Sequence, residues 1–104
     1  MKLLDLVIKE FLAIVEILEQ DYPIENNRII IDKEEFKKLL EKYAYITFKQ
    51  KSKAYKTLNF IIHDKNNYTL PCKDKETNKT VRKVVINYDT YITIKYLYGT
   101  FVNV

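Results

Sequence analysis

The sequence is poor in the residues that build catalytic and cofactor sites. Its 104 residues include one glycine, Gly99, whereas a phosphate-binding loop or a dinucleotide fingerprint needs several glycines for close backbone approach. The single histidine and single cysteine, His63 and Cys72, are too few for a zinc site, which usually takes four ligands. We interpret them as a polar residue at a helix end and a half-buried strand thiol rather than as a nucleophile pair. We therefore expect no enzyme activity, no metal and no cofactor.

Disulfide bonds and long apolar runs are also missing. One cysteine cannot form an internal disulfide, so nothing in the sequence indicates an oxidising compartment. The apolar N-terminal stretch is interrupted by Asp5, Glu10 and Glu16, which leaves it short of the roughly 18 apolar residues typical of a membrane span. The same acidic residues argue against a signal peptide. We expect a cytoplasmic protein that does not enter a membrane.

What the chain does contain is enough for one globular domain. With 47% hydrophobic and 31% charged residues, a chain of this length buries a real but modest core. We predict a single α+β domain over residues 1–104. It divides into a long N-terminal helix (1–20), a helix-turn-helix with a hairpin (28–83) and a C-terminal element (84–104).

The charge is strongly polarised along the chain. Residues 49–83 hold ten basic and three acidic residues, a balance of +7, whereas residues 1–48 have a balance of −3 and residues 84–104 are neutral. Clustered Lys and Arg displace counterions from phosphates and so form an electrostatic footprint for a polyanion. Nucleic acid is therefore the first partner to consider. The basic residues of this stretch are Lys49, Lys51, Lys53, Lys56, Lys65, Lys73, Lys75, Lys79, Arg82 and Lys83.

The apolar arc of the N-terminal helix, residues 2–20, is wider than one packing partner usually covers. Its apolar residues repeat every seven positions, which is typical of a packed helix pair. Two explanations fit: a homodimer through this helix, which we favour slightly, or cover by the C-terminal aromatic residues Tyr91, Tyr96, Tyr98 and Phe101. The predicted dimer interface consists of Leu4, Val7, Phe11, Ile14 and Leu18.

Further helices and a short strand follow. Pro23 ends the first helix, since the residue before a proline avoids the α region. The β-branched run 28–31 predicts a strand. Asp32, with a glutamate three residues later, predicts a capping box for a helix over 33–42. Residues 45–48 then interrupt the helical spacing and form a turn.

A second helix of this pair is predicted over residues 49–63. Ala54, Leu58, Ile61 and Ile62 fall at helical spacing, which turns one face of the helix inward. Either Thr47 or Ser52 caps its N-terminus.

The period then changes to two, which predicts a hairpin. Residues 68–73 form its first strand, which carries Pro71 and therefore lies at an edge or contains a bulge. Residues 74–80 are a polar loop without glycine, expected to be an extended and mobile tip, and residues 81–87 return as the second strand. Residues 88–98 fit a strand or a helix; we favour a helix that ends just before Gly99.

This order of elements resembles the winged helix-turn-helix superfamily over residues 3–87. The resemblance implies that 51–63 is the recognition helix and 74–80 the wing. The predicted helix has no arginine, so it lacks the usual bidentate reader of guanine, and phosphate-dominated binding is expected. The resemblance places Lys51, Ser52, Tyr55, Lys56 and Asn59 in a DNA groove and Lys75, Lys79 and Arg82 on flanking phosphates.

Two functions of different kinds follow from these features. One is a DNA-binding protein, most simply a small phage or bacterial transcriptional regulator or a replication accessory factor. The other is a phage-encoded inhibitor, resembling the anti-CRISPR class, that binds a host defence complex through the same basic face. Abundant Lys, Ile, Asn and Tyr suit an AT-rich genome and a mobile element. In either case the expected binding residues are Lys49, Lys51, Ser52, Lys53, Tyr55, Lys56, Asn59, Lys73, Lys75, Lys79, Arg82 and Lys83.

Overall fold

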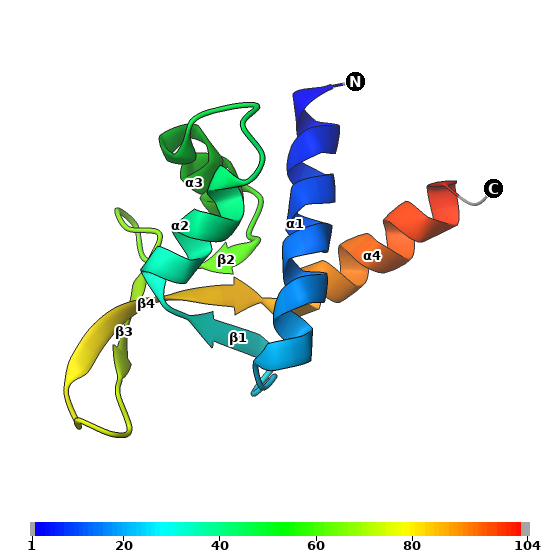
Figure 1. Cartoon of the computed structure of the whole chain (residues 1–104). Helices are drawn as coiled ribbons and strands as arrows, with labels where there is room; N and C mark the ends of the chain where they lie inside the picture. Colours follow the sequence, from blue (N-terminus) through cyan, green and yellow to red (C-terminus); the bar gives the residue numbers. More distant parts are fainter. Residues whose placement is uncertain (1, 103–104) are drawn as a thin grey trace.

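The computed structural model describes residues 2–102 and has an α+β architecture (Figure 1). Three helices pack together on one side of a small antiparallel sheet, and a fourth helix extends from the end of the central strand. The elements in chain order are α1 (Leu3–Asp21), β1 (Arg28–Ile31), α2 (Lys33–Glu41), α3 (Phe48–Thr57), β2 (Ile61–Ile62), β3 (Leu70–Lys73), β4 (Thr80–Asn87) and α4 (Tyr88–Val102).

The sheet is built around β4, which pairs with all three other strands. The strand order is β1-β4-β2. β3 pairs with the first half of β4, residues 80–83, so that β3 and β4 form a hairpin. Along β4, Val84 and Ile86 face the core cluster at the two-residue period of a strand. Pro71 lies in β3, which pairs with β4 alone, as expected for an edge strand.

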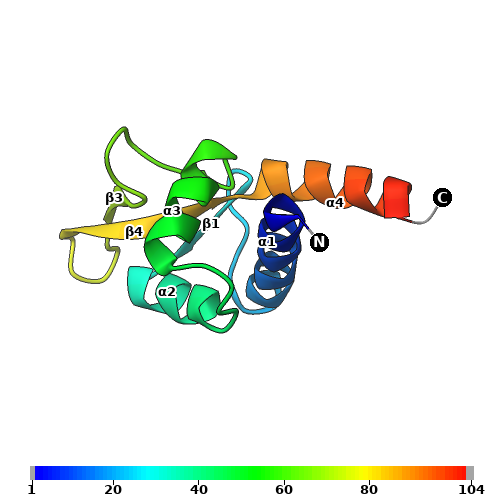
Figure 2. The same cartoon turned by 90° about the horizontal axis from the view of Figure 1, so that it is seen from above.

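The centre of the core is Phe11 of α1. Its ring stacks on Phe60 with centroids 4.0 Å apart and meets the edges of Tyr55 and Tyr91 at 5.8 and 6.3 Å. Tyr55 belongs to α3, Phe60 directly precedes β2, and Tyr91 belongs to α4. The wide apolar arc of α1 is therefore covered from several sides within one chain (Figure 2). Such burial of aromatic side chains contributes most of the packing energy of a small domain.

This packing corrects the predicted dimer interface. Four of its five residues, Val7, Phe11, Ile14 and Leu18, are buried in the chain's own core and are not available to a second copy. Only Leu4 is exposed, at 52%. Tyr91 supplies the cover that the alternative explanation assigned to the C-terminal aromatics, whereas Tyr96 is exposed and the side chain of Phe101 lies outside the described residues.

The helix predicted over residues 49–63 was too long. It ends at Thr57, and Asn59 takes a left-handed conformation (φ 58°) that reverses the chain. Ile61 and Ile62 then pair with Ile86 and Val85 of β4. The apolar spacing that mimicked a helix is explained by strand residues that are buried against the same core.

The helix caps differ from the prediction at one site and agree at another. Thr47 caps α3 with a complete capping box: its side chain accepts from the backbone N–H of Gln50, and the Gln50 side chain accepts from the backbone N–H of Thr47. Asp32 precedes α2, but its side chain makes no capping hydrogen bond and instead lies 3.4 Å from the ammonium of Lys83. The capping box predicted at Asp32 is therefore wrong.

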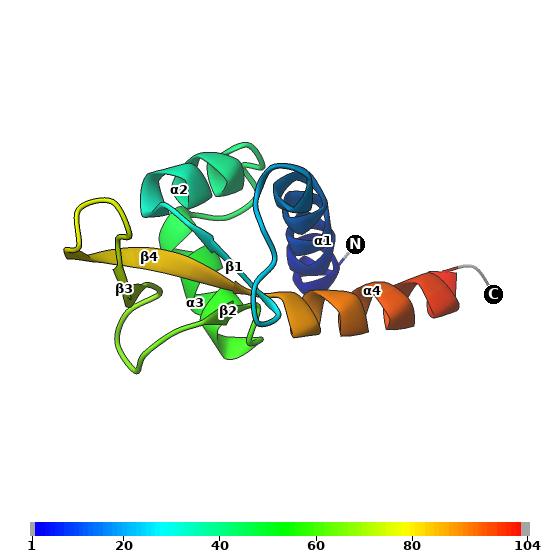
Figure 3. The ribbon, with the colours of Figure 1, turned by 90° about the horizontal axis from the view of Figure 1, so that it is seen from below.

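The C-terminal segment is a helix, as favoured from the sequence. It starts directly after β4, where the Asn87 side chain accepts from the backbone N–H of Thr90. It continues through Gly99 to Val102 rather than ending before the glycine. α4 and the β3–β4 hairpin lie at opposite ends of the molecule (Figure 3).

A tyrosine–carboxylate hydrogen bond joins α4 to α1. The Tyr88 hydroxyl donates to Glu19 Oε2 at 2.8 Å, and this bond, with burial, raises the pKa of Tyr88 to about 12 from 10.0. Between these values the unfolded chain loses the proton while the folded protein keeps it, so stability falls as pH rises. We predict that the free energy of unfolding, measured by urea unfolding, falls less between pH 10 and 12 in the Tyr88→Phe variant than in the unmodified protein. Equal losses would show that this bond does not contribute to the alkaline transition.

Candidate nucleic-acid interface

Lys51 and Glu10 form an ion pair inside the protein. Both residues are almost fully buried, at 1% and 4% exposure, and Lys51 Nζ lies 2.5 Å from Glu10 Oε2. The other Glu10 oxygen accepts from the hydroxyls of Tyr45 (3.0 Å) and Tyr55 (2.8 Å). The prediction that Lys51 and Tyr55 contact DNA is wrong, because both side chains point into the core from α3.

The same lysine completes the C-terminal end of α2. Its ammonium donates to the Leu40 carbonyl oxygen in the last turn of α2 and to the Tyr43 carbonyl oxygen just beyond it, in addition to Glu10. All three of its protons are thus used. Burial, then the negative charge of Glu10, raises the pKa of both Tyr45 and Tyr55. We refer to Glu10, Tyr45, Lys51 and Tyr55 as the buried network; it ties α1, the α2–α3 turn and α3 into one arrangement.

The outer face of α3 carries a row of lysines. Lys49 and Lys53 are exposed and Lys56 is half-buried. These positions are separated by four and three residues, so they lie along one side of the helix. Because Lys51 is fixed inward, this row is the basic part of α3 that lies at the surface.

Lysines also surround the β3–β4 hairpin. Lys73, Lys75 and Lys79 are exposed. The tip is a closed turn rather than the extended loop we expected: the backbone N–H of Asp74 donates to the Lys79 carbonyl, and Asn78 adopts φ 60°. The hydrogen bond from the backbone N–H of Glu76 is the main reason that the pKa of Asp74 is lowered. The hairpin and α3 both lie on the side of the molecule away from α4 (Figures 1 and 2).

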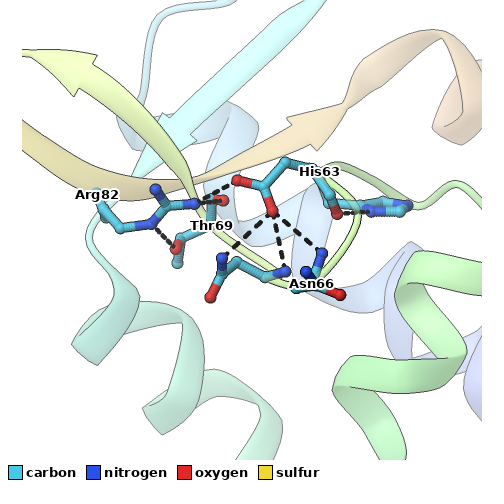
Figure 4. Close-up of polar contacts among 6 residues, drawn as sticks. His63, Asn66, Thr69 and Arg82 are labelled. Atoms are coloured by element: carbon cyan, nitrogen blue, oxygen red, sulfur yellow. Dashed lines mark hydrogen bonds and ion pairs between the residues drawn. The ribbon is translucent and has the colours of Figure 1, made fainter.

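Two further predicted binding residues are engaged within the chain. Lys83 is half-buried beside Asp32. Arg82 donates from Nη2 to Asp64 Oδ2 (2.7 Å) and to the Thr69 carbonyl (2.6 Å), and from Nε to Thr69 Oγ1 (2.9 Å) (Figure 4). Its guanidinium holds the loop of residues 63–69 against the hairpin.

Two polar residues expected in a DNA groove have other positions. Ser52 is half-buried, and its hydroxyl donates to the Lys49 carbonyl within α3. Asn59 is exposed but lies beyond the helix end, where its left-handed backbone forms the turn into β2. Ser52 therefore lies on the side of the lysine row but is partly covered, and Asn59 lies outside α3.

A basic hollow was not anticipated from the sequence. It has a volume of about 260 Å³ and lies where the C-terminal half of α3 meets the 63–69 loop. His63 was predicted at the end of the 49–63 helix and Lys65 in the basic stretch beyond it, but spacing along the chain gave no sign that Lys65 meets α3. Its lining residues are Lys53, Lys56, Thr57, His63 and Lys65.

No protein-family model matches the chain, and a search of curated proteins returns no significant match. Within residues 2–102, no helix is long and apolar enough to cross a membrane. The same residues contain no group of three or more His, Cys, Asp or Glu side chains arranged to hold a metal ion.

Proposed function

We propose that this protein is a winged helix-turn-helix protein that binds duplex DNA. The proposal rests on two features taken together. The chain order is α2, a turn, α3 and then a hairpin, and exposed lysines lie on both α3 and the hairpin. The sheet order β1-β4-β2, with the hairpin extending from β4, supports the assignment. In this class a helix enters the major groove and the basic wing contacts the flanking backbone.

The internal ion pairs sharpen the charge argument. Lys51 is paired with Glu10 in the core, and Arg82 and Lys83 are paired with Asp64 and Asp32 nearer the surface. Six other lysines, on α3 and on the hairpin, still form a basic surface. They are Lys49, Lys53, Lys56, Lys73, Lys75 and Lys79.

Contacts to phosphates, rather than to base edges, dominate the proposed complex. Lysine binds phosphate as a flexible point charge, whereas bidentate reading of guanine favours arginine. Gln50, the one amide on the exposed face of α3, is used in the capping box. A replication accessory factor or a regulator with modest sequence preference is the role that fits best.

The hairpin provides the test of this proposal. Replacing Lys75 and Lys79 together with Gln is expected to reduce the slope of log K against log salt by about 2 in magnitude, because each phosphate contact contributes about 0.9. Fluorescence anisotropy with a labelled duplex measures this slope.

A matched control removes the same number of positive charges from other surfaces of the protein. Lys9 on α1 and Lys95 on α4 are exposed, and replacing both with Gln removes two charges from other surfaces. The slope of this control should equal that of the unmodified protein. If the hairpin variant also keeps the full slope, the hairpin does not contact DNA.

A further inference from the structure

The basic hollow beside α3 combines cations from two separate segments. Lys53 and Lys56 come from α3, and Lys65 comes from the 63–69 loop. No acidic side chain is among its lining residues. Three lysine side chains therefore line a space of about 260 Å³, and their positive charges favour an anion there.

The loop that supplies Lys65 is fixed by Asp64. One carboxylate oxygen accepts from the backbone N–H groups of Asn66 and Asn67 and from the Asn67 side chain, and the other accepts from Arg82 (Figure 4). The bond from Arg82 is the largest reason that the pKa of Asp64 is lowered. Asp64 therefore holds the turn on which Lys65 stands while its own charge is neutralised by Arg82.

His63 forms a rigid wall between the two segments. Its Nδ1 lies 2.7 Å from the Asp64 carbonyl oxygen, and its Nε2 lies 3.2 Å from the Lys56 carbonyl oxygen at the end of α3. Carbonyl oxygens only accept hydrogen bonds, so the ring nitrogen is the donor wherever such a bond forms. The ring thus lies between the loop and the C-terminal end of α3 and contacts both.

We propose that the hollow binds one phosphate group, and that the source of this group is the backbone of the bound nucleic acid. The inference rests on the DNA-binding function proposed above and adds a specific contact to it. A phosphate presents several negatively charged oxygens to converging ammonium donors. Lys53 belongs both to the exposed row of α3 and to the hollow, so a strand that follows α3 passes directly over the hollow.

Inorganic phosphate is the first probe. His63 is the only histidine in the chain, and its imidazole resonances in NMR spectra report on the hollow alone. In the unmodified protein we expect a saturable shift of these resonances on addition of phosphate, relative to chloride at equal ionic strength. Lys65→Gln should weaken phosphate binding roughly fivefold, because one charge-assisted contact is lost at an exposed site.

Two variants separate the hollow from general surface charge. Asp64→Asn keeps the three lysines but loosens the loop, and it should also weaken phosphate binding. Lys75→Gln on the hairpin should leave the affinity for phosphate unchanged. If phosphate binds Lys65→Gln and Asp64→Asn as tightly as the unmodified protein, the inference is overturned.

A duplex DNA titration identifies the source of the phosphate. The inference predicts that duplex DNA shifts the His63 resonances and prevents inorganic phosphate from binding. DNA binding that leaves His63 unaffected would overturn this inference and leave the DNA function in place. Phosphate binding in the hollow without any DNA binding would overturn the DNA function and assign the hollow to a free phosphate.

Discussion

Replacing Lys51 with Met is expected to destabilise the protein by about 3 to 5 kcal/mol, since removal of one partner of a buried ion pair leaves the other charge uncompensated. In this variant the Glu10 carboxylate keeps only the two tyrosine hydroxyls as donors, and the carbonyls of Leu40 and Tyr43 lose the hydrogen bond from the ammonium. The loss is large relative to the 5 to 15 kcal/mol that typically stabilises a domain. Urea unfolding followed by circular dichroism measures it.

The double variant Glu10→Gln with Lys51→Met tests the mechanism. The glutamine still accepts from the tyrosine hydroxyls but carries no charge, so the double variant should be more stable than Lys51→Met alone. Lys49→Met, on the exposed side of the same helix, should change the stability by less than about 0.5 kcal/mol. Equal destabilisation by Lys51→Met and Lys49→Met would show that the buried network does not hold α3 in place.

Truncating Phe11 to Ala should cost about 3 to 5 kcal/mol, the usual range for a fully buried phenylalanine. The ring is completely buried among Tyr55, Phe60 and Tyr91, which belong to three segments, so the cavity cannot collapse without moving all of them. The free energy of unfolding from urea titration gives the measurement.

Leu4→Ala is the matched control on the same helix. Leu4 is 52% exposed, so its truncation should cost less than about 0.5 kcal/mol. A comparable loss in both variants at low concentration, together with a dimer mass in light scattering, would contradict the assignment of α1 to the core of a single chain.

Hydrophobic periodicity predicted those elements in which one face is buried against the core. The apolar arc of α1 and the alternation along β4 were visible in the sequence, because each follows from packing against one core. The segment 49–63 was misread since Ile61 and Ile62 keep helical spacing with Ala54 and Leu58. The left-handed turn at Asn59 and the pairing with β4 depend on contacts far along the chain, which local spacing does not contain.

The candidate interface was predicted in part for the same reason. The basic stretch was evident from composition, but the separation of its members into binding and structural cations was not. Lys51 is buried because Glu10, 41 positions earlier, and two carbonyl oxygens at the end of α2 and just beyond it converge on its ammonium. Arg82 is likewise occupied by Asp64 and Thr69. Only the folded arrangement shows which lysines remain on the surface.

The most direct test of the DNA-binding claim is the affinity of the unmodified protein for a random-sequence duplex across a salt series. If the six lysines of α3 and the hairpin named above all contact phosphates, the slope of log K against log salt should be about −5, since each contact contributes about 0.9. A steep slope of this order, with binding still measurable near physiological salt, is the predicted result. No binding at that salt, or a slope near zero, would contradict the account and favour a protein partner for the same basic face.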